Sequence, residues 1–319
     1  MDKVCLTTYV YGEKYQDYIP FLVYTCNRSY PEYDIILFLY DKIRPEIKQQ
    51  LDLIGSKKLT LLEEAYNDCP SMSPLKAKSL RWVMYDERFN KYDYIYVVDI
   101  DMLYIREPMP LHLQHLQHMS TTGLCYDNIV RHFRRKVNLR STVRRIKYAG
   151  LRGLWQFWFS SKDDFRVSGL HFFAVKQYFS VIDSSVREKY KKMIYNGSFV
   201  KLTLSSNNEA FLYSMLRMEG LKPDLLPVQT KSVIMLDFNN PTRPQFRPHH
   251  GIHLGIFRDV ISSTEKRSGI LNSEPYKYYI FKYRSEYSKD PLFQDLLRLS
   301  SSEIRGYISN LNTYYKIEE

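Results

Sequence analysis

The fold of this chain is decided by Tyr94-Ile95-Tyr96-Val97-Val98-Asp99-Ile100-Asp101. Its first five residues form an unbroken run of aromatic and β-branched side chains, and the turn-forming Asn90 and Asp93 come just before it. Such a run predicts a strand that is buried on both faces. Two carboxylates follow the strand, one residue apart, and carboxylates are costly to bury without a cation or a set of hydrogen-bond donors.

Asp99 and Asp101 therefore predict a ligand site. Open α/β sheets place ligands at the carboxyl ends of their strands. A hard divalent metal with oxygen ligands, most often carrying nucleotide phosphates, is the natural partner of two such carboxylates. An Asp-x-Asp sequence can also simply begin an exposed turn, but a second apolar piece at residues 102–105 favours the ligand site.

The segments before this motif alternate between strand and helix patterns. We expect strands at residues 4–9, 35–40, 59–62 and 94–98, and helices at 15–27, 45–54 (closed by Gly55) and from Ser73-Pro74 to about residue 88. This order implies a parallel, doubly wound sheet. Further on we expect strands at 167–175 and 221–228, and helices at 178–194, from 205–212 onward and at 302–315.

Composition sets broad limits. The 319 residues are 44% hydrophobic, which is enough for a sizeable core, and the net charge of +11 suits nucleic acid, an anionic membrane surface or anionic substrates. The four cysteines are scattered without a Cys-x-x-Cys pair, so we expect neither a zinc site nor a disulfide framework. With no signal peptide and no apolar run long enough for a membrane span, we expect a cytoplasmic protein, with any membrane contact peripheral.

The strand order and the Asp-x-Asp motif resemble the nucleotide-binding half of the GT-A fold of glycosyltransferases. They are similar to glycosyltransferase family 8 and to bacterial polysaccharide- and lipopolysaccharide-assembly transferases. The resemblance implies an α/β, Rossmann-like fold with a doubly wound, mostly parallel sheet flanked by helices. It also implies a single catalytic domain over residues 1–270, with a nucleotide-binding half (1–120) and a small acceptor half (121–270), followed by a helical extension over 271–319.

The resemblance implies a donor site around the motif. Asp99 and Asp101 would hold Mn²⁺ or Mg²⁺ against the diphosphate of a nucleotide sugar. The end of the first strand would contact the base and ribose, and the helix before the motif would present basic residues, of which Lys78 and Arg81 share a face; Lys76 lies on the same helix. The nucleotide-binding candidates near the motif are thus Thr8, Tyr9, Tyr11, Lys78, Arg81 and Ile100.

Two pairs in the second half match the family in part. Ser168-Gly169 matches a small pair that lines the donor sugar, with Val167 where the family has Asn. His171 would line the acceptor side or serve the structure. Asn208-Glu209 fits an acidic pair near the reacting carbon of the sugar, with Asn replacing one acid. Glu209 would contact the sugar or act on the acceptor hydroxyl, or simply favour the helix dipole.

A histidine cluster forms the second chemical motif. His249, His250 and His253 are three of the eight histidines, within five residues. His253-x-Gly255-x-x-Arg258 resembles a C-terminal His-Phe-x-Gly-x-x-Lys segment of the family, one residue shorter before the glycine and with Arg for Lys. His253 would complete the metal site, with His250 as the alternative; Arg258 would contact the diphosphate, and Gly255 would let the backbone approach it. A His-rich loop without metal is the competing interpretation.

A basic stretch follows the Asp-x-Asp motif in the sequence and precedes the candidate site residues in the second half of the chain. Residues 130–152 carry nine Lys or Arg and no acid, and aromatic residues follow at 154–159. This pattern suits anionic lipid headgroups, single-stranded nucleic acid or a solvated loop. No nucleic-acid-binding module is recognisable, so we expect no nucleic-acid partner. Two interpretations of residues 130–159 stay open: contact with an anionic acceptor or, peripherally, with the inner face of an anionic membrane, and a solvated loop beside an ordinary core segment.

Together these patterns predict a metal-dependent hexosyltransferase. It would move a sugar from a UDP-sugar to a glycan or lipid-linked glycan acceptor, with retention of configuration if family 8 is the right relative. Two alternatives remain: a non-catalytic basic adaptor with a transferase-like fold, and an Asp-x-Asp phosphatase. In such phosphatases the motif lies on an early strand and Thr or Val follows it, whereas here it lies on about the fourth strand and Met102 follows.

Overall fold

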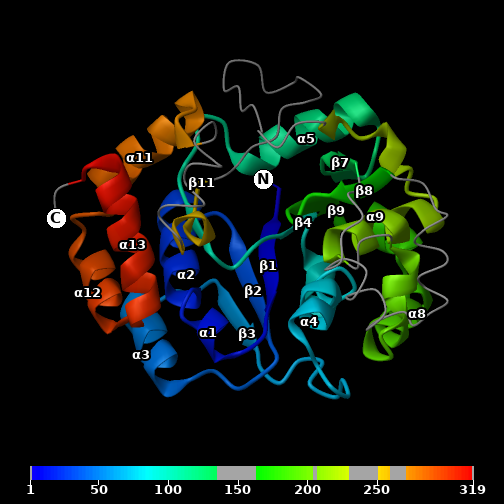
Figure 1. Cartoon of the computed structure of the whole chain (residues 1–319), viewed down its shortest axis with the longest axis horizontal. Helices are drawn as coiled ribbons and strands as arrows, with labels where there is room; N and C mark the ends of the chain where they lie inside the picture. Colours follow the sequence, from blue (N-terminus) through cyan, green and yellow to red (C-terminus); the bar gives the residue numbers. More distant parts are fainter. Residues whose placement is uncertain (1, 135–162, 204–206, 230–250, 259–270, 318–319) are drawn as a thin grey trace.

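A computed structural model of the chain describes residues 2–134, 163–203, 207–229, 251–258 and 271–317. Its centre is a six-stranded sheet with the order β3-β2-β1-β4-β9-β6 (Figure 1). The strands are β1 (Val4–Val10), β2 (Asp34–Leu39), β3 (Leu59–Leu62), β4 (Tyr94–Val97), β6 (Tyr126–Asp127) and β9 (His171–Ala174). The first four are mutually parallel, and β9 runs antiparallel to both β4 and β6. The predicted mixed α/β fold with a mostly parallel sheet is confirmed.

Helices connect the parallel strands as the alternating pattern predicts. They are α1 (Glu13–Gln16), α2 (Ile19–Ser29), α3 (Pro45–Ile54) and α4 (Pro74–Leu80), followed by the short η1 (Glu87–Lys91). Proline stands at the start of α2, α3 and α4, where its missing N–H costs no hydrogen bond. Gly55 ends α3 in the left-handed conformation, as expected from its position.

The second half of the chain adds helices and two small sheets. The helices are α5 (Leu111–Thr122), α7 (Val175–Val181), α8 (Ser184–Tyr195), η2 (Ser198–Leu202), α9 (Asn208–Met218) and η3 (Pro223–Leu225). One small sheet contains β7 (Val130–Arg134), β8 (Asp163–Val167) and β10 (Val228–Gln229). The other pairs β5 (Met102–Tyr104) with β11 (Gly251–His253), which leads into η4 (Leu254–Arg258). The chain closes with α11 (Glu274–Glu286), α12 (Pro291–Leu299) and α13 (Ser302–Tyr315).

The central sheet is covered on both faces, and its strands alternate between two cores. Ile95 and Val97 of β4 pack in the cluster that includes α4, α8 and α9. Tyr96 and the following Val98 pack in the cluster that includes α2 and the C-terminal helices. Figure 1 shows these two groups of helices on opposite sides of the sheet. The prediction of a strand buried on both faces is thus confirmed for β4.

The C-terminal helices belong to the main core. Tyr279 donates to Glu107 Oε1 at 2.7 Å, and Tyr287 donates to the carbonyl of Tyr104 at 3.0 Å. α12 packs on α2 and α3, and α13 packs on η4. These helices therefore cover the α2 side of the sheet; the expected domain boundary at residue 270 stays a prediction.

Several predicted boundaries are wrong. The helix from Ser73 ends at Leu80 and does not reach residue 88, because residues 79–84 are all buried and one face of a helix cannot bury six consecutive residues. The helix expected at 15–27 is divided into α1 and α2. The strand expected at 221–228 is mostly η3, where Lys222 has a positive φ of 49° and Pro223 follows, with only the short β10 at its end.

Two other predicted elements are each divided in two. The strand expected at 167–175 is β8 and β9, with Ser168-Gly169-Leu170 linking the small sheet to the central one. The helix expected at 178–194 is α7 and α8, because the Asp183 carboxylate accepts from the N–H of Val186 and caps a new helix. Both divisions occur where a short polar or glycine-containing link redirects the chain.

Two observations bear on the expected setting. All four cysteines are free. Within the described ranges, no helix has both the length and the apolar character that crossing a membrane requires. The basic and aromatic stretch at 130–159 is described only up to residue 134, in β7, and its remainder lies outside the described residues, as do His249 and His250.

Candidate active site

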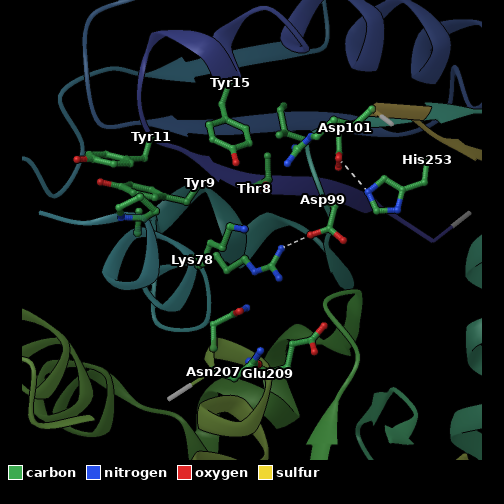
Figure 2. Close-up of a pocket in the computed structure, with 16 residues that line it drawn as sticks. Thr8, Tyr9, Tyr11, Tyr15, Lys78, Asp99, Asp101, Asn207, Glu209 and His253 are labelled. Atoms are coloured by element: carbon green, nitrogen blue, oxygen red, sulfur yellow. Dashed lines mark hydrogen bonds and ion pairs between the residues drawn. The ribbon is translucent and has the colours of Figure 1, made fainter. Parts of the chain in front are cut away.

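A pocket of about 300 Å³ lies at the carboxyl ends of β1 and β4 (Figure 2). Twelve of the predicted site residues line it: Thr8, Tyr9, Tyr11, Lys78, Arg81, Asp99, Ile100, Asp101, Asn208, Glu209, His253 and Arg258. They come from segments up to 250 residues apart, since Thr8 and Arg258 are both among them. Four further lining residues are not among the predicted site residues: Tyr15, Pro74, Ala77 and Asn207.

Asp99 is held by a cation from α4's end. The Arg81 Nη1 donates to Asp99 Oδ1 at 2.5 Å, and the guanidinium lies 4.2 Å from the ring centre of Trp82. Gly169, in the link between β8 and β9, packs directly on this pair: a Cβ at Gly169 would lie 2.9 Å from Arg81 Nη2 and 3.3 Å from Asp99 Oδ2. The close approach explains why a residue without a side chain stands here.

Asp101 is held by a histidine from the other end of the chain. β11 pairs with β5 so that His253 lies opposite Met102, and the N–H of Leu254 donates to the carbonyl of Asp101 at 2.8 Å. His253 Nε2 then lies 2.9 Å from Asp101 Oδ2. Burial raises the pKa of the Asp101 carboxyl, but the adjacent imidazole, a backbone hydrogen bond and the charge of Lys78 together lower it by more, so the net pKa is below the usual range.

Gly255 leaves room for this contact. A Cβ at Gly255 would lie 2.5 Å from Asp101 Oδ2 and 3.2 Å from His253 Nε2. We therefore expect Gly255→Ala to separate the carboxylate from the imidazole and to weaken nucleotide binding in the presence of Mn²⁺ by roughly 10- to 100-fold, the usual cost of disturbing a ligand's support. Calorimetric titration with UDP measures this.

The matched control for Gly255→Ala is Gly306→Ala. Gly306 lies in α13, and a Cβ there would meet no atom within 4 Å. The exchange should leave nucleotide affinity unchanged and should favour the helix slightly, since Ala is the better helix former. Equal affinities for Gly255→Ala and the parent protein would show that the Asp101–His253 contact does not support binding.

The donor atoms here suit a divalent cation chemically. Carboxylate oxygens with an imidazole nitrogen are ligands that Mn²⁺ accepts, and carboxylate oxygens suit Mg²⁺. Asp101 and His253 are already in contact, whereas Asp99 turns to Arg81 (Figure 2). Accordingly, within the described ranges no three His, Cys, Asp or Glu side chains converge as a metal site would require. For Asp99, Asp101 and His253 to hold one cation together, the Asp99 carboxylate has to leave Arg81.

The start of α9 forms the opposite wall. The side chain of Asn207 caps the helix by accepting from the N–H of Glu209 at 2.7 Å. Trp82 Nε1 donates to the carbonyl of Asn208 at 3.0 Å, which ties the end of α4 to this wall. The Glu209 carboxylate forms an ion pair with Arg131 of β7. Asn207 was detectable as one of the polar residues before the helix, whereas nothing in the sequence connects Arg131 with Glu209.

Tyrosines line the pocket where the first strand ends. The Tyr9 hydroxyl donates to the carbonyl of Ala65 at 2.9 Å, and the Tyr11 hydroxyl donates to that of Met72 at 3.4 Å. These bonds fix the rings to the segment after β3. Tyr15 lies beside them in Figure 2. A wall of fixed aromatic rings suits a flat, partly apolar group such as a nucleobase.

Three predicted residues lie elsewhere. His171 is 1% exposed and packs among Trp82 and Tyr126 in the core, which favours its structural interpretation. Ser168 is not among the lining residues; its N–H donates to Asn128 Oδ1 at 2.9 Å. Lys76 is turned away from the pocket, since its ammonium donates to the carbonyl of Tyr195 at 2.7 Å.

Comparison with known proteins gives distant structural likenesses. A scan against protein-family models finds no match, and neither does a search of curated proteins. Among solved structures, the chain is similar to the mannosyltransferase Ktr4p from S. cerevisiae (10% identity, TM-score 0.41, 66% of this chain and 64% of that one). It is also similar to the glycosyltransferase GlyE of Streptococcus pneumoniae TIGR4 (12% identity, TM-score 0.43, 99% of this chain and 64% of that one). A third similar structure is that of the galactosyltransferase LgtC in complex with donor and acceptor sugar analogues (13% identity, TM-score 0.33, 62% of this chain and 70% of that one).

The chain spans 64% of the length of both Ktr4p and GlyE. At these identities and TM-scores the likeness is distant, so the activity of the chain has to be inferred from its own pocket. Glycosyltransferase family 8 is not singled out among these structures. The strand order of the central sheet gives the chain the mixed α/β fold that its resemblance to GT-A glycosyltransferases implies, and the three solved structures named above are glycosyltransferases.

Proposed function

We propose that this pocket binds a nucleotide sugar and that the protein is a metal-dependent glycosyltransferase. One observation carries the proposal: Asp101 and His253 are in contact at the carboxyl end of β4, in a pocket that also contains Asp99. Lys78, Arg81 and Arg258 line the same pocket. Acidic ligands for a cation beside basic ligands for phosphate suit a metal-bound diphosphate.

The roles of the residues follow from their places in the pocket. Asp99, Asp101 and His253 would hold Mn²⁺ or Mg²⁺, which when bound neutralises charge on the diphosphate leaving group. Lys78, Arg81 and Arg258 would bind the phosphate oxygens and stabilise the negative charge that develops there. Thr8 and the tyrosines would contact the nucleoside, and UDP is the nucleotide that the family resemblance favours.

The wall at α9 would face the transferred sugar. An acceptor hydroxyl oxygen would form a bond to the anomeric carbon while the bond from that carbon to the diphosphate breaks, and the hydroxyl proton would be released. The family 8 resemblance favours retention of configuration. If the reaction instead inverts the anomeric carbon, Glu209 is the lining residue suited to accept the proton. The acceptor that we propose is a glycan or lipid-linked glycan.

Calorimetric titration with UDP and with GDP, each with and without Mn²⁺, tests the proposal. We expect binding with a dissociation constant on the order of micromolar only when Mn²⁺ is present. A panel of UDP-sugars should then reveal slow hydrolysis of one of them, with water replacing the acceptor. Folded protein that binds no nucleoside diphosphate under any of these conditions would favour the basic adaptor instead.

A further inference from the structure

Each acidic side chain of the pocket is paired with a basic side chain from another segment. Asp99 pairs with Arg81, Asp101 with His253, and Glu209 with Arg131. The first two pairs lie at the end of β4, where the proposed nucleotide diphosphate would bind. The third lies at the opposite wall, and the proposed reaction so far gives Arg131 no role.

Arg131 stands on a rigid backbone. It is in the middle strand of the small sheet, opposite Arg166 of β8 and opposite Gln229 of β10. A strand with ladder hydrogen bonds on both sides fixes the direction of its side chains. The Arg131 side chain is 30% exposed, and its Nε is buried without a hydrogen-bond partner among the described residues. The Nε of this guanidinium is therefore shielded from solvent, and Glu209 is the anionic partner of Nη2.

Glu209 is held at two points. Its backbone N–H is bound by the Asn207 cap, and its carboxylate Oε1 accepts from Arg131 Nη2. Within the described ranges, Oε2 has no such bond, and the residue lines the pocket. A free glutamate side chain samples many rotamers, and fixing it costs conformational entropy. The ion pair pre-organises the carboxylate before any ligand arrives.

We propose that Arg131 is a positioning residue, which acts through Glu209 by fixing its carboxylate so that Oε2 faces the sugar or the attacking hydroxyl. This inference rests on the proposed function of the pocket. A misplacement of about 1 Å can cost on the order of 100-fold in rate. The pair thus makes turnover depend on Arg131, although Arg131 itself lies outside the pocket lining.

A double-mutant cycle on Arg131 and Glu209 tests the inference. The variants are Arg131→Ala, Glu209→Gln and the double variant, each assayed for UDP binding in Mn²⁺ and for hydrolysis of the UDP-sugar that the parent protein cleaves. We expect Arg131→Ala to lower kcat by roughly 10- to 100-fold with UDP affinity unchanged. In the Glu209→Gln background the same exchange should have no effect, because the group through which Arg131 acts is already lost.

Arg131→Lys and Arg166→Ala complete the design. The lysine keeps the positive charge but lacks the planar, forked guanidinium, so kcat of Arg131→Lys should lie between those of Arg131→Ala and the parent protein. It also keeps the test possible if Arg131→Ala does not fold. Arg166 is the cross-strand neighbour, and its guanidinium pairs with Asp164 at 2.6 Å. Arg166→Ala should therefore leave kcat within about twofold of the parent protein.

Three results would overturn the inference. Equal losses from Arg131→Ala in the parent and Glu209→Gln backgrounds would mean that Arg131 acts independently of Glu209. Weaker UDP binding by Arg131→Ala would place Arg131 on the nucleotide itself. An unchanged kcat would leave the ion pair without a role in turnover. Absence of UDP binding by the parent protein is a separate result, which would overturn the proposed function and with it this extension.

Discussion

Asp101→Asn should abolish metal-dependent nucleotide binding while the protein stays folded. The Asp101 carboxylate contacts His253, and the imidazole lowers its pKa, so it is ready to accept a cation at neutral pH. Asparagine has the same shape but no charge. Loss of a residue that merely supports a metal ligand costs about 10- to 100-fold in affinity, so loss of a ligand itself should cost at least roughly 100-fold.

Titration with UDP in Mn²⁺ and in EDTA measures this effect. Asp99→Asn should act in the same direction, and it should also free Arg81, whose partner is lost. Asp93→Asn is the matched control, because Asp93 is exposed just before β4, at the end remote from the pocket, where it accepts from the N–H of Lys3. An Asp101→Asn protein that binds UDP as tightly as the Asp93→Asn protein would contradict the assignment of the metal site.

Asp127→Asn should cause the largest loss of stability. Asp127 of β6 is 3% exposed, and its Oδ2 lies 2.5 Å from His115 Nδ1 and 3.3 Å from His118 Nδ1 on α5. The ring of Phe172 stacks on His115 with centres 4.5 Å apart. Removing one partner from a buried charged network costs about 3–5 kcal/mol. Urea unfolding should therefore show a strongly lowered midpoint for Asp127→Asn.

The contribution of Asp127 also depends on pH. Burial raises the pKa of its carboxyl, but the hydrogen bonds and electrostatic attraction of His115 and His118 together lower it by more, so the folded-state pKa lies well below the usual value. An unfolded aspartate has a pKa of about 3.9. The stability that Asp127 contributes is therefore present above that value and is lost as pH falls below it toward the folded-state pKa. The difference between the parent and Asp127→Asn should shrink below about pH 4.

Asp295→Asn provides the comparison for Asp127. Asp295 forms a surface ion pair with Arg298, and both side chains are at least half exposed. Such pairs contribute little, with a median of about 0 to 1 kcal/mol. Equal midpoints for Asp127→Asn and Asp295→Asn would show that the buried network does not stabilise the fold.

The elements in the first 100 residues could be predicted from the sequence because their signals are local. β4 and the following Val98 form a run of five aromatic and β-branched residues, and α3 begins at Pro45 and is closed by Gly55, so each element could be predicted from its own residues. The boundaries that were wrong depended on tertiary contacts. α4 stops at Leu80 because the next residues enter the core, and nothing in their identity alone indicates that.

The candidate site, too, has residues that a local motif predicts and contacts that depend on tertiary structure. Asp99 and Asp101 were visible as a motif at the end of a strand. The contact of Asp101 with His253 could be inferred only through family resemblance, because no periodicity relates residues 152 positions apart. The Arg131–Glu209 pair was not predicted. Arg131 is one of nine basic residues spread over residues 130–152, and its neighbours in space are set by the pairing of β7 with β8, which the sequence of this stretch does not reveal. The predicted roles of the basic stretch and of His250 stay predictions.

The pairing of β11 with β5 has a consequence for how the protein comes to be functional during synthesis. Asp99 and Asp101 leave the ribosome some 150 residues before His253 does. Contacts between such distant segments form late, because the chain between them must first be ordered. A nascent chain that ends before β11 therefore has the sheet and both aspartates without the histidine. The proposed cation site should therefore be complete only when the three residue pairs of β5 and β11 have closed, so that the proposed nucleotide binding depends on synthesis of β11.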